Sequence, residues 1–134
     1  MINYIFAFLV ALGSMVLLDA AWLGLIAPRF YRKHVGYIMA DKPNWTATIF
    51  FYLIFILGVT FFVVYPGWQH DQATMALALT GGLFGFVTYA TYDLTNQATL
   101  KNWPVIVTIV DLAWGTVLIA AVGVVAVTIL KVVT

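Results

Sequence analysis

Four long apolar runs constrain this chain more than any other feature of its sequence. They cover residues 5–26, 45–65, 73–92 and 103–130, and about 20 mostly apolar residues suffice for an α-helix to cross a bilayer. The runs are continuous rather than alternating, which favours helices over the strands of a barrel. We therefore predict an all-α fold: one bundle of four transmembrane helices that forms a single domain over residues 1–134.

The composition supports a membrane rather than an aqueous environment. Only 8% of the residues are charged and 64% are hydrophobic, whereas about 25% of the residues of a soluble domain are charged. The net charge of +1 gives no reason to expect a nucleic-acid partner. The chain has no cysteine, which excludes disulfides and thiolate metal sites. It also lacks a phosphate-binding loop and a dinucleotide fingerprint, so we expect neither a metal nor a cofactor.

The basic residues predict how the bundle sits in the membrane. With four spans, the connections at 28–43 and 93–102 lie on one side, and they carry Arg29, Arg32, Lys33, Lys42 and Lys101. The other side has only Lys131. Because positively charged loops stay in the cytoplasm, we expect both termini outside it. We also expect Asn44 and Asn102 to be helix N-caps, each followed by an interfacial Trp, Trp45 or Trp103.

Two apolar runs contain the same costly pair of residues, an Asp followed three positions later by a Trp. "LLDAAWLG" holds Asp19 and Trp22 in the first run, and "IVDLAWG" holds Asp111 and Trp114 in the last. Each Asp lies about eight residues, or about 12 Å, from the predicted cytoplasmic end of its helix. An Asp and a Trp at this spacing share a helix face. We therefore expect the two acids at one depth, bracketed by the two indoles.

The third predicted helix adds polar groups on the same side of the membrane. Gly81 and Gly85 have the spacing that permits close helix contact in lipid. Tyr89, Tyr92, Asp93 and Asn96 follow, with Asp93 at the expected end of this helix. The candidate ligand-binding residues are therefore Asp19, Trp22, Tyr89, Tyr92, Asp93, Asn96, Asp111 and Trp114.

Several stretches resemble one family of membrane proteins along nearly the whole chain. "LDAAWLG", "PNWTATIFFY", "FGFVTYATYDLTNQATLKNWP" and "VDLAWG" are similar to the DUF2177 family, a domain of unknown function in small bacterial membrane proteins. The resemblance implies a four-helix, multi-pass protein of the bacterial cytoplasmic (inner) membrane. It brings no reaction, substrate or catalytic residue with it.

Three interpretations of the buried acids remain open at this point. An Asp in a membrane span costs about 2.5–3.5 kcal/mol, which favours a functional role. The first interpretation is a protein that binds or moves a lipophilic or cationic small molecule or a lipid, and a transport path would require a homodimer. The second is a cofactor-free membrane enzyme, an isomerase or cyclase acting on a lipid or isoprenoid. The third is a structural or assembly subunit in which the acids only fix helix packing.

Overall fold

The computed structural model describes residues 1–134, and it confirms an all-helical chain with four helices long and apolar enough to span a membrane. The first span is α1 (Ile2–Leu25), followed by the short helix α2 (Ala27–Val35). The second span, Trp45–Gln69, is continuous but made of three parts: α3 (Trp45–Val59), the π-helix η1 (Thr60–Val64) and α4 (Tyr65–Gln69). The third and fourth spans are α5 (Thr74–Thr99) and α6 (Val105–Val133).

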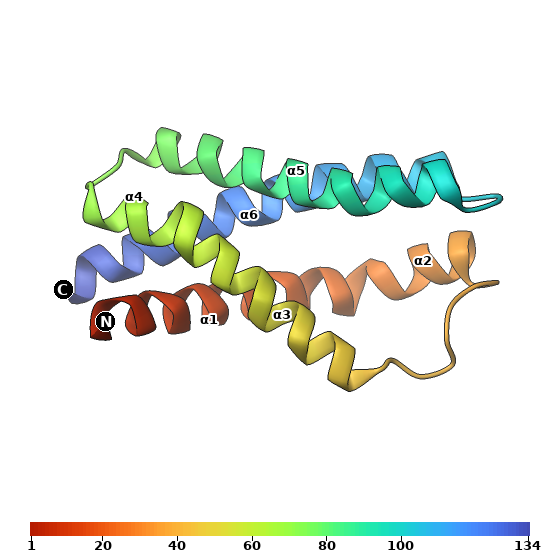
Figure 1. The fold of residues 1–134 in the computed structure, drawn as a ribbon, viewed down its shortest axis with the longest axis horizontal. Coiled ribbons are helices and arrows are strands. Elements are labelled where there is room, and N and C mark those ends of the chain that lie inside the picture. Colours follow the sequence, from red (N-terminus) through yellow and green to blue (C-terminus); the bar gives the residue numbers. More distant parts are fainter.

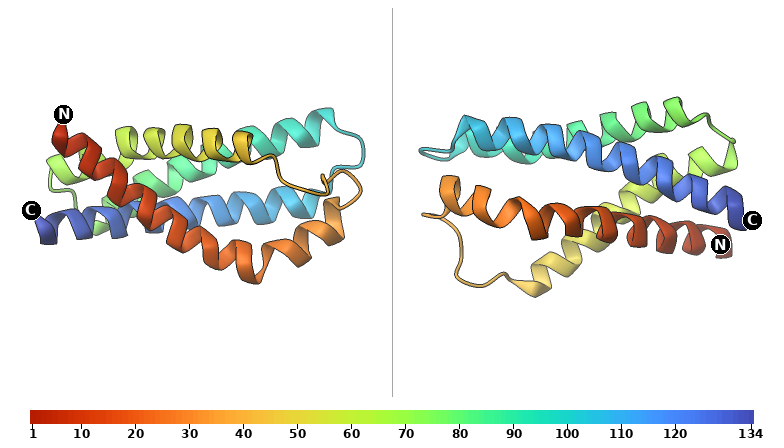
Figure 2. Two further views of the ribbon diagram at one scale, coloured as in Figure 1. Left: turned by 90° about the horizontal axis from the view of Figure 1, so that it is seen from below. Right: turned by 180° about the vertical axis from the view of Figure 1, so that it is seen from behind.

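The helices form an elongated bundle with two distinct ends (Figure 1). Helices α5 and α6 run side by side, α1 packs on α6, and α3 crosses the bundle obliquely (Figures 1 and 2). Both chain termini lie at one end, which we call the terminal end. The opposite end holds α2, the connection 36–44 and the turn 100–104, and we call it the basic end. It carries Arg29, Arg32, Lys33, Lys42 and Lys101.

Apolar side chains fill the bundle, and they are also exposed on its outer faces. The main core draws on α1, the second span and α6, with fully buried residues such as Ala11, Ile56 and Val122. Large apolar residues face outward, among them Leu17 at 76% exposed and Ile54 at 68% exposed. An outer surface of this kind is what the hydrocarbon of a bilayer covers.

Glycines allow α5 and α6 to approach each other closely, as their spacing predicts. A Cβ on Gly85 would lie 2.1 Å from the carbonyl oxygen of Gly115, and one on Gly81 would lie 2.6 Å from that of Ile119. Gly115 also accommodates the ring of Tyr89, which a Cβ would meet at 2.3 Å. The absence of side chains here thus fixes both the distance between the two helices and the position of one aromatic ring.

The third span is longer than the sequence indicates. We expected a helix over 73–92, with Asp93 at its end, but α5 continues to Thr99. The hydroxyls of Thr91, Thr95 and Thr99 each donate to a carbonyl four residues earlier in the chain. These residues therefore satisfy their own polar groups inside the helix. Asp93 consequently lies within α5 and faces the interior of the bundle.

The second span also continues past its expected end at Pro66. Proline lacks an N–H group and usually ends a helix, but here the π-helix η1 precedes it. The N–H of Tyr65 donates to the carbonyl of Thr60, five residues earlier. The helix then resumes as α4, with Pro66 in its first turn, where a missing N–H is tolerated.

The basic end differs from the expectation in three places. Asn44 is an N-cap as predicted, and its side chain accepts from the N–H of Ala47 at 3.1 Å. Asn102 is not a cap: it adopts a left-handed conformation with φ of 60°, and Pro104 is the N-cap of α6. Trp103, which we expected to be an interfacial anchor, is only 8% exposed, because it packs against Val35 and Val107 and donates to the hydroxyl of Thr108. The connection 28–43 contains the helix α2, which we expected as a loop.

The glycine contact between α5 and α6 predicts the effect of a single methyl group. Gly85→Ala should lower the free energy of unfolding by about 1–3 kcal/mol, because the added Cβ overpacks against the backbone of α6. Gly13→Ala is the control, since a Cβ on Gly13 meets nothing within 4 Å. Unfolding by sodium dodecyl sulfate in mixed micelles measures both changes. Equal stability of the two variants would contradict the close contact.

Candidate functional site

Three aspartates of the spans lie in the half of the bundle nearer the basic end, and all three are buried. Asp19 of α1 and Asp111 of α6 are each 7% exposed, and Asp93 of α5 is fully buried. A carboxyl group in this environment needs hydrogen-bond donors from the protein, because hydrocarbon offers none. The three acids differ in how far the chain supplies those donors.

Asp19 has a donor for each of its oxygens. The hydroxyl of Tyr52 on α3 donates to Oδ2, and the indole N–H of Trp114 on α6 donates to Oδ1 at 3.4 Å. Trp114 also stacks on Trp22, with ring centroids 4.6 Å apart and planes 12° apart. Asp19 therefore ties three spans together at one point.

Asp111 is linked to the short helix α2. The hydroxyl of Tyr31 donates to its Oδ1. Burial of Tyr31 and its hydrogen bond to Asp111 raise the pKa of this phenol above the ordinary value of 10.0. The proton therefore stays on Tyr31 at neutral pH, and the phenol remains a donor.

Asp93 has no donor at all. Neither of its oxygens has a hydrogen-bond partner in the chain, although both are buried. The carboxyl group of Asp111 lies nearby, at the same cavity. Two carboxylates can only accept hydrogen bonds, so neither can satisfy the other while both are ionised. Asp93 thus keeps unused acceptor capacity.

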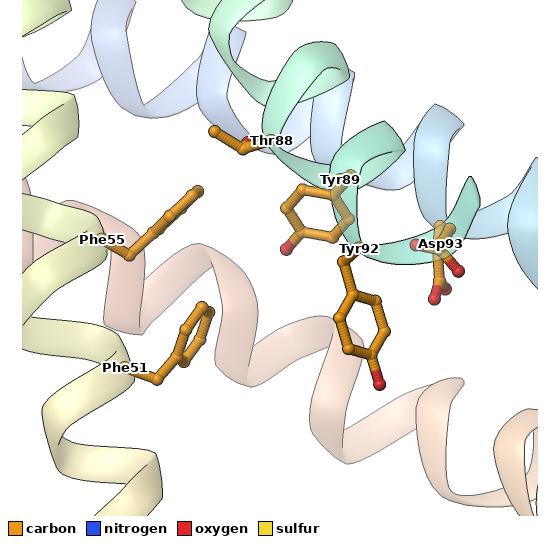
Figure 3. Close-up of a pocket in the computed structure, with 7 residues that line it drawn as sticks. Phe51, Phe55, Thr88, Tyr89, Tyr92 and Asp93 are labelled. Carbon is orange, nitrogen blue, oxygen red and sulfur yellow. The ribbon is translucent and has the colours of Figure 1, made fainter. Parts of the chain in front are cut away.

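Asp93 and Asp111 lie at a cavity of about 310 Å³ between α3, α5 and α6 (Figure 3). Its wall is otherwise mostly aromatic and consists of Phe51, Phe55, Thr88, Tyr89 and Tyr92. In Figure 3, the hydroxyl of Tyr89 points into the space between α5 and α3. The size is at the lower end of the range for small-molecule sites, about 300–1,000 Å³.

The cavity reaches the outer surface of the bundle between α3 and α5. Phe51 is 51% exposed and Tyr92 is 62% exposed, and both stand at its wall. Behind them, the ring of Phe55 bridges the two helices, 6.0 Å from Phe84 and 6.3 Å from Tyr89 between ring centroids. The opening therefore faces the side of the bundle, where a bilayer lies, and its closed end holds the two carboxyl groups.

The structure brings together four of the eight predicted site residues, Tyr89, Tyr92, Asp93 and Asp111, at this cavity. Asp19, Trp22 and Trp114 form the neighbouring cluster and do not line it. Asn96 is half-buried one turn beyond Asp93, also outside the lining. The acid beside Asp111 is Asp93 rather than Asp19, and the two indoles stack on each other instead of bracketing a pair of acids.

Sequence reasoning missed the two tyrosine donors and two phenylalanines of the cavity wall. Tyr31 lies in a connection that we expected to be a polar loop, so nothing placed it near α6. Tyr52 stands alone among apolar residues in "TIFFYLIF", and a phenol in such a run needs a buried partner. That signal identifies Tyr52 as a donor, but Phe51 and Phe55 resemble ordinary lipid-facing residues. The structure contains no group of three or more His, Cys, Asp or Glu side chains that could hold a metal ion.

The hydrogen bond from Tyr52 to Asp19 should contribute measurably to stability. Tyr52→Phe should lower the free energy of unfolding by about 0.6 kcal/mol and at most about 1.7 kcal/mol, the average and the maximum measured for hydrogen bonds between spans. Tyr92→Phe is the matched control, because its phenol is largely exposed and no hydrogen bond involves it in the structure. Unfolding in mixed micelles measures both values. Equal losses in the two variants would show that the hydroxyl of Tyr52 ties no helices together.

Comparison with known proteins agrees with this architecture. No curated protein and no solved structure matches the chain. Residues 4–128 match the family described as "Predicted membrane protein (DUF2177)". Because the match covers nearly the whole chain, the protein belongs to the DUF2177 family of predicted membrane proteins.

Proposed function

We propose that this protein binds an amphiphile with a cationic, hydrogen-bond-donating head group in the cavity between α3, α5 and α6. The observation that carries the proposal is Asp93, a buried carboxyl group without any donor at the closed end of that cavity. A primary ammonium has three N–H donors, and Asp93 lacks a donor. It also has a positive charge, which would compensate an ionised carboxyl group of Asp93 or Asp111.

The aromatic walls support the same class of ligand. Tyr89 and Phe55 line the cavity, and the faces of aromatic rings attract a cation, most strongly when it is desolvated. Phe51 and Tyr92 stand where the cavity reaches the outer surface, so an aliphatic tail would leave between them into the lipid. The ligand would enter sideways from the bilayer rather than from water.

Asp19 has a different role in this proposal. Its two oxygens already have donors in Tyr52 and Trp114, so it offers little to a ligand. The packing interpretation of the buried acids therefore fits Asp19, whereas the ligand-binding interpretation fits Asp93 and Asp111.

Binding to a set of amphiphiles in nanodiscs tests the proposed ligand class. Dodecylamine should bind more tightly than dodecyltrimethylammonium, which has the charge but no N–H donor, and dodecyl sulfate should not bind. Asp93→Asn should weaken dodecylamine binding about tenfold or more, because a charge-assisted hydrogen bond is lost. Isothermal titration of the protein in phosphatidylcholine nanodiscs, corrected with empty nanodiscs, measures these affinities.

Asp41→Asn is the matched control for this experiment. Asp41 is exposed in the connection between α2 and α3, so the substitution removes the same charge far from the cavity. It should leave dodecylamine affinity unchanged. Equal binding of dodecylamine and dodecyl sulfate, or equal effects of the two Asp→Asn substitutions, would refute a cation site at Asp93.

We further propose that the basic end faces the cytoplasm of a bacterium and that both termini lie outside, in the inner membrane. The support is the charge distribution, with five of the six Lys and Arg residues at the basic end. Alkaline phosphatase fused to either terminus should be active, and green fluorescent protein at the same positions should not fluoresce. The opposite result would reverse the orientation without affecting the cavity.

A further inference from the structure

We propose that the outer face of α2 is a second, separate binding site, for the phosphate of an anionic phospholipid head group. The helix lies outside the four spans and begins two residues after α1 ends. A bend separates the two helices, as Figure 2 shows. This position places α2 at the edge of the apolar part of the bundle, where lipid phosphates lie.

The two faces of α2 have different chemistry. The inner face is held by the buried residues Ala27 and Val35 and by the hydrogen bond from Tyr31 to Asp111. The outer face carries Arg29, Arg32 and Lys33, all exposed. Their spacing of three and four residues places the three cations side by side. Because the inner face is fixed, the basic face keeps a defined position.

These cations line a hollow and have no acidic partner. Arg29, Arg32, Lys33 and Pro28 line a surface hollow of about 410 Å³. The single ion pair in the structure joins Lys131 to Asp71 at the terminal end. The only acid in the connection that contains α2 is Asp41, which is exposed and unpaired. Three neighbouring like charges destabilise a helix unless an anion compensates them.

Stabilisation by the dipole of α2 explains only two of the three cations on its outer face. Arg32 and Lys33 lie in the last turn of α2, where the helix dipole favours cations. Arg29 lies in the first turn, where the same dipole disfavours a cation. A phosphate between the three side chains would compensate Arg29, and arginine binds phosphate oxygens through two N–H groups at once. In a membrane, phospholipids supply such phosphates at the height of α2.

The test compares two pairs of substitutions that remove equal charge. Native mass spectrometry in detergent counts phosphatidylglycerol and phosphatidylcholine molecules bound to the intact protein. The parent chain should retain phosphatidylglycerol preferentially. Arg29→Gln/Arg32→Gln should lower phosphatidylglycerol affinity about tenfold or more, since each basic residue contributes to the attraction. Lys42→Gln/Lys101→Gln, at the same end but outside the hollow, should leave it nearly unchanged.

Three outcomes would overturn the proposal. Equal losses in the two double variants would mean that only overall charge matters. An absence of preference for phosphatidylglycerol over phosphatidylcholine would mean that the hollow holds no anionic lipid. Displacement of phosphatidylglycerol by millimolar glycerol phosphate would indicate a soluble phosphate ester as the ligand instead. Size-exclusion chromatography of each variant shows whether it remains folded, and none of these results bears on amine binding at Asp93.

Discussion

A carboxyl group inside a bilayer has to find its hydrogen-bond donors within the protein, and this requirement organises half of the molecule. Asp19 accepts hydrogen bonds from Tyr52 of α3 and Trp114 of α6, while Asp111 accepts one from Tyr31 of α2. These bonds are directional, whereas the terminal half depends on close apolar packing. Asp93 is the exception, because it is buried and no group of the protein donates a hydrogen bond to it.

The close contact between α5 and α6 explains how that exception arises. With no side chain at Gly85 or Gly115, the two backbones touch, and the next turns bring Asp93 and Asp111 together. On the side of α5 that faces α3, the bulky ring of Phe55 lies between these two helices, and a cavity remains there. Tight packing on one side and aromatic spacing on the other therefore place a pair of acids at the end of an apolar cavity.

The sequence predicts the four spans well because their hydropathy is a local property. It also predicts a close helix contact at Gly81 and Gly85 from their spacing, although not that α6 is the partner, and it predicts the cap at Asn44. It does not predict that α5 continues beyond Tyr92. The threonine hydroxyls of this segment can donate to carbonyls four residues earlier only once the segment is helical. The pairing of Asp93 with Asp111 was missed for the same reason. A residue placed at a helix end would face the turn, whereas the additional helix up to Thr99, about two turns, directs Asp93 into the bundle.

The π-helix of the second span has an evolutionary consequence. A π-turn is an α-turn with one additional residue, and here it occupies Thr60–Val64 between two ordinary helical segments. A related chain that lacks one residue of this segment, and has another residue in place of Pro66, would form a regular α-helix and still direct both flanking segments toward their present neighbours. Most single-residue deletions in a span rotate every later side chain by about 100°. This position is therefore where the length of the span can change while its buried and lipid-facing sides stay the same.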